Sequence, residues 1–341
     1  MAEAWRRVGS IVNPSAGSGV ELALQAARSA LSSIGAEEVL TGAGQTGAAA
    51  LSGWSGRVVV HDVGAVSGRE QTRALARWMA GQNVAALVVV GGDGTLADVA
   101  QVCIEVGCRT PILGIGAGST NVGRLVTCRA SEASQLHPDK LETWNMDCLT
   151  ASVNDDLMGR AFNDVVIGYT VVGTIDGQVR DIDGAARLRG KLTLGTPRPV
   201  ATSKTRVTRS SKDGETVVAE GESVGTVVAG FAEPAFFGKA VSGGICLAAL
   251  AGLPAGCLVC SLPLVQVQMS ASALLCAAPM ISSYVTLSEE VSILVERVRD
   301  DAVLCVDGNP LRLLNQSDRI VISVRKDAVR GVRFRKNPRS A

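Results

Sequence analysis

Residues 91–95 read Gly-Gly-Asp-Gly-Thr and directly follow the apolar run of residues 85–90. Glycines let backbone N–H groups approach phosphate oxygens closely, and Asp93 adds a carboxylate beside them. Apolar residues at helical spacing follow over residues 96–106, so the loop opens a helix whose N-terminus favours an anion. The alternative is a plain strand-to-helix turn, but such a turn does not need the aspartate. We therefore expect a phosphate-binding loop in which Asp93 holds magnesium, orients a hydroxyl or accepts its proton.

A second glycine-rich segment follows the first expected strand. Residues 13–19 read Asn-Pro-Ser-Ala-Gly-Ser-Gly and precede a helix, with Asn13 and Gly17 as the residues of interest. Small residues and exposed N–H groups at a helix start favour phosphate binding. The segment lacks the lysine of a Walker A loop, so on its own it fits a plain turn equally well.

A third such segment, residues 114–121, again follows an expected strand. Its glycines allow close backbone approach, and Ser119, Thr120 and Asn121 offer donors and acceptors to a ribose or a phosphate. A structural loop is the alternative interpretation.

Asn163 and Asp164 stand directly before the apolar run of residues 165–167, although both residue types are disfavoured in strands. A carboxylate there can accept the two hydroxyls of a ribose, and an amide can bind the edge of a base. A turn-type pair explains the same two residues without any ligand.

The residues of the first three segments follow strands of an expected α/β domain. Apolar β-branched runs predict strands, and amphipathic spacing predicts helices between them. The expected strands are 8–12, 58–61, 85–90 and 111–115, and the expected helices are 20–34, 69–80 and 96–106. This alternation predicts a doubly wound, mostly parallel sheet, whose ligands lie beyond the carboxyl ends of the strands.

After residue 129 the pattern changes to short β-like runs separated by Gly, Asp or Pro, with a helix expected only near residues 174–189. We therefore expect an α/β nucleotide-binding domain over residues 1–140 and a largely antiparallel, β-rich domain over residues 141–341. The second domain is expected to complete an active site between the two. Its last strand, or the segment after it, is expected to pack back on the first domain.

The composition excludes several classes of function. Lys and Arg number 33 against 32 Asp and Glu, a formal net charge of +1, and aromatic residues make up 3% of the chain. This balance gives no broad attraction for nucleic acid or an acidic membrane surface, and it offers few platforms for stacking bases. The 9 cysteines come without a secretory signal, so a reducing cytoplasm is expected. Cys257 and Cys260 lack a second pair at zinc-ribbon spacing, so we expect buried thiols and no metal site made by the protein alone.

No charged residue occurs from Ala240 to Ser288. Glycines and prolines interrupt this stretch too often for a membrane-spanning helix, so buried strands and turns are expected and stable membrane insertion is not. We expect the uncharged surface to form a homodimer contact, with peripheral membrane contact as the alternative.

Together these segments resemble the superfamily that contains the ATP-NAD kinases and the diacylglycerol and sphingosine lipid kinases. Residues 91–95 match its shared Gly-Gly-Asp-Gly-Thr motif. Residues 12–14 with Gly17 are similar to the opening of lipid kinases and archaeal-type NAD kinases, and residues 161–167 resemble the NAD-kinase strand with its Asn-Glu/Asp pair. Within the group, the chain is most similar to the ATP-NAD-kinase-like proteins, including the acetoin-catabolism X proteins. Three later segments resemble the closing β region of NAD kinases: residues 282–287, 306–308 and 318–322.

The resemblance implies an ATP-dependent kinase that phosphorylates the 2′-hydroxyl of the adenosine ribose of NAD to give NADP, with Mg²⁺ or another divalent cation accompanying ATP. Asp93 would be the catalytic carboxylate that activates this hydroxyl. Asn163 and Asp164 would hold the nicotinamide-side ribose and its amide. The remaining residues would bind the nucleotide and its phosphates: Gly91, Gly92, Gly94, Thr95, Asn13, Gly17, Ser119, Thr120 and Asn121.

Two departures from the family pattern leave the acceptor open. NAD kinases usually carry a Thr/Ser-Gly-Ser/Thr-x-Ala-Tyr segment in the β domain, and residues 241–245 are only a partial match. Residues 118–121 are partly similar to the lipid-kinase Gly-Thr-Gly-Asn. The alternatives are a lipid kinase of the diacylglycerol or sphingoid type, and a nucleotide-binding regulatory protein without turnover. The phosphate donor, ATP or polyphosphate, stays open as well.

Overall fold

The computed structural model describes residues 5–118, 121–175, 178–231, 245, 247–263 and 281–335. The chain divides into two compact units, one formed by residues 1–147 together with 327–341 and the other by residues 148–326. Two long strands, β7 (Leu141–Val153) and β20 (Arg319–Phe334), run through the points of division. β7 carries the chain out of the first unit, and β20 brings it back.

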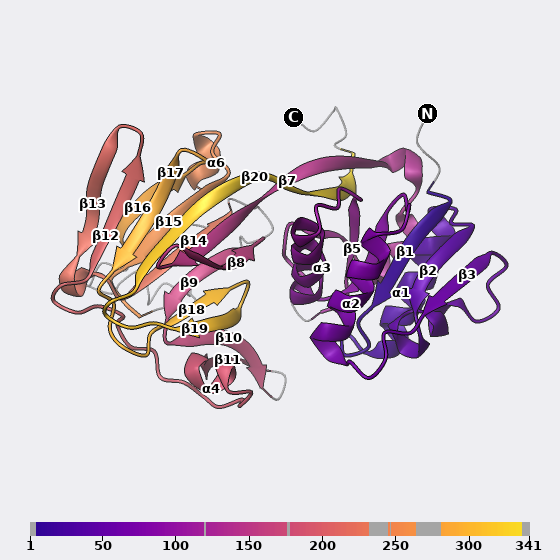
Figure 1. Cartoon of the computed structure of the whole chain (residues 1–341), viewed down its shortest axis with the longest axis horizontal. Helices are drawn as coiled ribbons and strands as arrows, with labels where there is room; N and C mark the ends of the chain where they lie inside the picture. The colour runs from indigo at the N-terminus through magenta and orange to yellow at the C-terminus, as the bar shows by residue number, and fades with distance from the viewer. Residues whose placement is uncertain are drawn as a thin grey trace. The chain divides into compact units, whose positions relative to one another are not determined.

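The first unit is a parallel sheet with helices on both faces (Figure 1). Its strands lie in the order β3-β2-β1-β4-β5, β6 pairs with β5, and all these ladders are parallel. Gly331 of β20 also pairs in parallel with Ile112. The strands are β1 (Arg7–Val12), β2 (Glu38–Gly42), β3 (Arg57–His61), β4 (Leu87–Gly91), β5 (Ile112–Gly116) and β6 (Val126–Arg129). The helices are α1 (Val20–Ser33), α2 (Gly68–Ala80) and α3 (Asp93–Glu105), with 3-10 turns η1 (Gly44–Thr46), η2 (Ala48–Leu51), η3 (Ala130–Gln135) and η4 (Pro138–Lys140).

Alternation along the strands decides which helix covers which face. Val88 and Val90 of β4 share a buried core with the inner side of α1. Leu87 points to the opposite face, because successive side chains of a strand alternate. On that face Gly9 of β1 makes room for α2, since a Cβ there would lie 2.7 Å from Met79 Sδ.

The predicted doubly wound sheet is confirmed. The expected strands and helices of this unit are present with shifted ends, and β2 and β6 are additional strands. One shift bears on the chemistry: α3 begins at Asp93, not at Leu96 as expected. The aspartate therefore belongs to the first turn of the helix.

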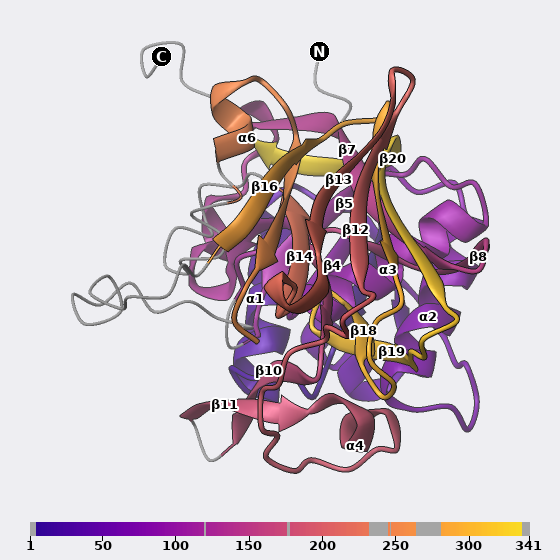
Figure 2. The same cartoon turned by 90° about the vertical axis from the view of Figure 1, so that its left-hand side faces the viewer.

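The second unit consists of antiparallel strands in two sheets (Figures 1 and 2). One sheet has the order β13-β12-β17-β20, with β7 pairing to β20 and β8; the other has the order β16-β15-β14-β9-β18-β19, and β10 and β11 form a separate hairpin. The strands are β8 (Asp156–Ala161), β9 (Asp164–Gly168), β10 (Thr170–Ile175), β11 (Gln178–Asp183), β12 (Arg206–Ser211), β13 (Gly214–Glu220), β14 (Thr226–Phe231), β15 (Ala255–Cys260), β16 (Ile281–Leu287), β17 (Val291–Glu296), β18 (Val303–Val306) and β19 (Asn309–Leu313). The short helical elements are α4 (Gly184–Leu188), η5 (Gly221–Ser223) and α6 (Leu247–Leu250).

The two sheets share one apolar core. Val207 of β12 and Ile293 of β17, from the first sheet, belong to the same buried cluster as Val165 of β9 and Val227 of β14, from the second. The expected antiparallel β domain is confirmed. The helix expected near residues 174–189 is wrong: this segment contains the end of β10, all of β11 and the short α4.

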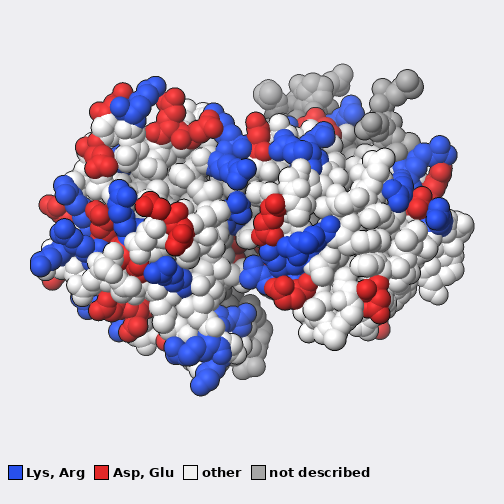
Figure 3. Space-filling view, viewed as in Figure 1, with Lys and Arg blue, Asp and Glu red and all other residues white. Residues whose placement is uncertain are grey.

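Basic and acidic side chains lie next to one another on the face shown in Figure 3, with uncharged areas between them. Within the described part of the chain, no helix combines the length and the apolar character needed to cross a membrane. Much of the uncharged stretch of residues 240–288, including most of the partial match at residues 241–245, lies outside the described residues. The homodimer contact expected there stays a prediction.

Candidate active site

Residues 91–95 turn the chain from β4 into α3. Gly91 ends β4, Gly92 is the N-cap and Asp93 is the first residue of α3, followed by Gly94 within the first turn. The carbonyl of Gly92 accepts the N–H groups of Thr95 at 3.0 Å and of Leu96 at 3.2 Å. A Cβ on Gly91 would lie 2.6 Å from that of Thr95, so only glycine fits. The turn thus presents a helix N-terminus, which favours an anion, at the carboxyl end of a parallel strand.

The loop after β5 lies against this turn through two glycines. The N–H of Ala117 donates to the carbonyl of Gly91 at 2.8 Å. A Cβ on Gly118 would lie 2.6 Å from Gly92 Cα, so the two backbones approach too closely for a side chain between them. The side chain of Asn121 closes the loop, because its Oδ1 accepts the N–H of Gly118 at 2.7 Å and its Nδ2 donates to the carbonyl of Gly118 at 2.6 Å.

Ser119 and Thr120, which the sequence selects as nucleotide-binding residues, lie outside the described residues. Their proposed roles therefore stay predictions.

The carboxylate of Asp93 is fixed by the residues that follow this loop. The N–H of Gly123 donates to its Oδ1 at 2.8 Å, and the N–H of Val122 donates to its Oδ2 at 3.4 Å. The residue is half-buried. An ionised carboxylate has about four acceptor positions, so these two hydrogen bonds leave lone pairs for a ligand. Asp93 is therefore held in place and can still accept a proton or bind a cation.

The loop after β1 completes the cluster. Asn13 donates from Nδ2 to Thr95 Oγ1 at 2.8 Å, and its Oδ1 accepts the N–H of Ser15 at 2.9 Å. The Oγ and N–H of Ser18 both donate to the carbonyl of Ala117, at 2.6 and 2.9 Å. Gly17 is exposed in the same loop. All three glycine-rich segments of the sequence thus meet at the carboxyl ends of β1, β4 and β5, where Asn13 joins the first loop to the Asp93 turn and Ser18 joins it to the loop after β5.

In the second unit, Asn163 and Asp164 stand at the start of β9. Three consecutive N–H groups, of Phe162, Asn163 and Asp164, donate to Asp307 Oδ1 at 3.1, 2.7 and 3.1 Å, and the first also donates to Oδ2 at 2.9 Å. The N–H of Asp307 donates in return to the carbonyl of Asp164 at 2.9 Å. Asp307 therefore fixes the backbone that carries Asn163 and Asp164.

Sequence reasoning did not single out Asp307 as a site residue. Asp307 and Gly308 form the two-residue turn between β18 and β19, with φ of 48° and 72°. Asp-Gly is typical of such hairpin turns, so the turn is predictable. Its contact is not, because 143 to 145 residues separate Asp307 from the N–H groups that it binds.

The amide of Asn163 shows a feature that points to a ligand. Its Oδ1 is buried and has no hydrogen-bond partner. Leaving such a group unsatisfied costs about 1–3 kcal/mol. A ligand that donates an N–H or a hydroxyl to this oxygen would remove that cost.

Comparison of the sequence with known proteins shows the family of the chain that carries this site. The model of the ATP-NAD kinase N-terminal domain matches residues 8–133, a range that contains all three loops of the cluster. An uncharacterised protein of Archaeoglobus fulgidus is 32% identical over 233 residues, which cover 67% of this chain and 68% of that protein. The chain belongs to the NAD kinase and diacylglycerol kinase superfamily. It is a kinase, a phosphotransferase of this fold.

The chain aligns over nearly its whole length with solved structures of the NAD kinase and diacylglycerol kinase fold. A Bacillus anthracis str. Sterne protein assigned as a diacylglycerol kinase is 15% identical and covers 98% of this chain and 99% of its own, with a TM-score of 0.52. Yeast NADH kinase, solved with NADH, is 13% identical and covers 98% of this chain and 85% of its own, with a TM-score of 0.52. At these identities, the likeness establishes the fold alone.

The surroundings of Asp307 shift the pKa of its carboxyl. Burial, and after it the charge of Asp164, raise the pKa of this carboxyl, and the three N–H groups lower it; the net result is a pKa of about 7. Asp307 therefore titrates near neutral pH.

The residues of the cluster suit a metal ion carried by the nucleotide. No group of three or more His, Cys, Asp or Glu side chains in the described ranges could hold a metal ion. Mg²⁺ in phosphoryl-transfer sites usually takes only about one or two protein carboxylates, together with phosphate oxygens and waters. Asp93, with its remaining lone pairs, fits that role in a kinase of this superfamily.

Proposed function

We propose that the protein is an ATP-dependent NAD kinase. The observation that carries this proposal is Asp93, which is fixed by two N–H groups at a helix N-terminus inside a glycine turn. Phosphoryl transfer needs positioning and neutralisation of charge more than covalent chemistry from the protein. A fixed carboxylate with lone pairs to spare, beside amides that suit phosphate, meets both needs.

In the proposed reaction, Asp93 accepts the proton of the 2′-hydroxyl on the adenosine ribose of NAD. The resulting oxygen attacks the γ-phosphorus of ATP, and the bond from that phosphorus to the bridging oxygen breaks, giving NADP and ADP. Mg²⁺ supplies neutralisation of the phosphate charge when it is bound. Gly91, Gly92, Gly94 and Thr95 would bind the phosphates.

The second unit would recognise the other half of NAD. Asn163 would bind the nicotinamide amide, whose N–H groups suit the unpaired Oδ1. Asp164 would accept hydroxyls of the nicotinamide-side ribose. We also propose that the protein is a cytoplasmic homodimer and that its substrates are small molecules only.

The test is the Asp93→Asn variant in a coupled assay of NADP formation from NAD, ATP and Mg²⁺. We expect kcat to fall about 10²- to 10⁴-fold, as is usual for loss of a general base. Binding of ATP and the melting temperature should stay near those of the wild type, because asparagine keeps an oxygen for the N–H of Gly123. Asp62→Asn, at an exposed position after β3, is the matched control. Full activity of Asp93→Asn would contradict the assignment of the base.

A lipid kinase of the diacylglycerol or sphingoid type is the second candidate. The Asn13-Pro14 opening, which is similar to that of lipid kinases, and the uncharged stretch of residues 240–288 favour it. The same preparation is therefore assayed with NAD and with diacylglycerol in mixed vesicles, with ATP or polyphosphate as donor. Phosphatidic acid without NADP supports the lipid kinase. Tight binding of NAD with neither product supports a regulatory protein without turnover.

A further inference from the structure

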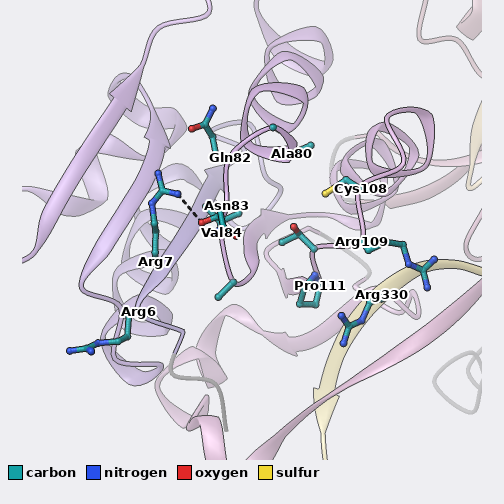
Figure 4. Close-up of a pocket in the computed structure, with 13 residues that line it drawn as sticks. Arg6, Arg7, Ala80, Gln82, Asn83, Val84, Cys108, Arg109, Pro111 and Arg330 are labelled. Carbon is teal, nitrogen blue, oxygen red and sulfur yellow. Dashed lines mark hydrogen bonds between the residues drawn. The ribbon is translucent and has the colours of Figure 1, made fainter.

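A hollow of about 970 Å³ lies at the amino-terminal edge of the first unit's sheet, the edge opposite to the Asp93 loop (Figure 4). It is bordered by the starts of β1, β4 and β5, the end of α2 and one residue of β20. Four arginines line it, and no acidic residue is among the lining side chains: Arg6, Arg7, Arg109 and Arg330. In a chain with a formal net charge of only +1, this is a local excess of positive charge.

Two of these arginines form no ion pair with a described carboxylate. Arg109 donates from Nη1 to the carbonyl of Asp327 at 2.6 Å and from Nη2 to Asn145 Oδ1 at 3.4 Å. Arg330 donates from Nη2 to Thr143 Oγ1 at 2.9 Å. No described acidic side chain forms an ion pair with either guanidinium. Neutral acceptors thus hold both groups in place and leave their charge and several of their five N–H donors available.

The other two arginines are partly neutralised. Arg6 Nη2 lies 2.7 Å from Glu37 Oε1, and its side chain points away from the other labelled residues in Figure 4. Arg7 donates to the carbonyl of Asn83 at 2.8 Å, and its Nε lies 3.3 Å from Glu38 Oε1. The ligand-binding charge of the hollow therefore comes mainly from Arg109 and Arg330.

A purely structural explanation is that these arginines complement the ends of α2 and α3, since cations are favourable at helix C-termini. Arg109 and Arg330 do not fit it. Their acceptors are Asn145, Thr143 and the carbonyl of Asp327, and none of these belongs to the last turn of either helix.

We propose that this hollow binds a phosphate-bearing small molecule of nucleotide size through Arg109 and Arg330, at a second anion site distinct from the Asp93 loop. Guanidinium groups match phosphate oxygens with paired N–H donors, and they are the usual choice for binding phosphate. The volume falls within the range of about 300–1,000 Å³ typical of small-molecule sites.

Cys108 provides a local reporter of occupancy, because it lines the same hollow and is half-buried. The other described cysteines are buried: Cys103, Cys128, Cys148, Cys257, Cys260 and Cys305. A hydrogen bond from Cys103 lowers the pKa of Cys108, which favours the reactive thiolate. Its alkylation by iodoacetamide, followed by peptide mass spectrometry, therefore measures access to the hollow.

The experiment uses pyrophosphate as the probe, with sodium chloride at equal ionic strength as the reference. We expect pyrophosphate to slow alkylation of Cys108 at least several-fold in the full-length wild type. The protection should be lost in Arg109→Gln/Arg330→Gln. It should persist in Arg57→Gln/Arg187→Gln, which removes the same charge at exposed positions outside the hollow.

Three results would overturn the proposal: no protection in the wild type, equal protection in the Arg109→Gln/Arg330→Gln variant, or equal loss in the control pair. The first needs no variant, so the test does not depend on folding of the substituted chain. Arg109→Lys/Arg330→Lys keeps the charge without the paired donors and should give weaker protection than the wild type.

Discussion

Two aspartates bound by backbone amides have different roles because their surroundings differ. Asp93 is half-buried and accepts two N–H groups, which leaves lone pairs for a substrate or a cation. The carboxyl of Asp307 is buried, accepts three N–H groups and lies beside a second acid, Asp164. Its acceptor capacity is used within the protein. Asp93 is therefore suited to chemistry and Asp307 to positioning.

The raised pKa of Asp307 predicts a pH dependence of stability. Between the pKa of an ordinary aspartate, about 4, and the folded-state pKa near 7, the folded protein holds a proton that the unfolded chain has released. The contribution of this group is therefore fully present below about pH 4 and is lost as the pH rises to about 7.

In Asp307→Asn, which cannot ionise, the free energy of unfolding should fall less between about pH 5 and about pH 8 than it does in the wild type. Urea denaturation at both pH values measures the difference. Asp213→Asn, in the exposed turn between β12 and β13, should keep the wild-type pH dependence. Identical pH dependence in the wild type and Asp307→Asn would show that Asp307 does not titrate in this range.

At the scale of elements, the sequence predicts the first unit better than the second. Parallel strands end at one edge of a sheet, so glycine-rich segments after β1, β4 and β5 had to lie close together. The hairpin β10–β11 was missed although Asp176-Gly177, a dipeptide typical of hairpin turns, stands between its strands. Apolar residues there also fit helical spacing, and local pattern alone does not decide between the two. The Asp307 contact was missed for the different reason that it is long-range.

The close approach of two loops predicts the effect of a single methyl group. In Gly118→Ala the new Cβ would lie 2.6 Å from Gly92 Cα, and because that neighbour is backbone, the loops must separate. We expect a loss of about 1–3 kcal/mol in stability, as for other overpacked sites. NADP formation should fall about 10²-fold, because the Asp93 turn is displaced.

Gly168→Ala is the control for this variant. The nearest atoms to its new Cβ lie 3.8 Å away, an ordinary contact, so stability and activity should stay near those of the wild type. Thermal denaturation and the coupled NADP assay measure both quantities. Wild-type activity in Gly118→Ala would mean that the packing of the two glycines does not position the Asp93 turn.

At the scale of the whole molecule, the chain returns to its first unit after completing the second. Residues beyond Lys326 supply a backbone pair, Gly331 with Ile112, and a buried side chain, Val332, to the first unit. The carbonyl of Val332 also accepts the hydroxyl of Thr127 at 2.7 Å. The first unit therefore depends on residues nearly two hundred positions beyond the matched range of residues 8–133.

Removal of this returning segment should loosen the first unit selectively. A chain truncated after Lys326 loses Gly331, one of the two strand partners of Ile112, and the acceptor of Thr127, yet it keeps the pairing of Ile293 with Ile322 in the second unit. We expect faster amide hydrogen exchange in β5 and β6 and unchanged exchange in β12 and β17. A chain truncated after Arg335 keeps every one of these contacts and should exchange like the full-length protein. Because β5 leads into the loop that packs on the Asp93 turn, the proposed NADP formation should fall together with the protection of β5. Faster exchange in both units alike would mean that the returning strand stabilises the whole fold and not the first unit selectively.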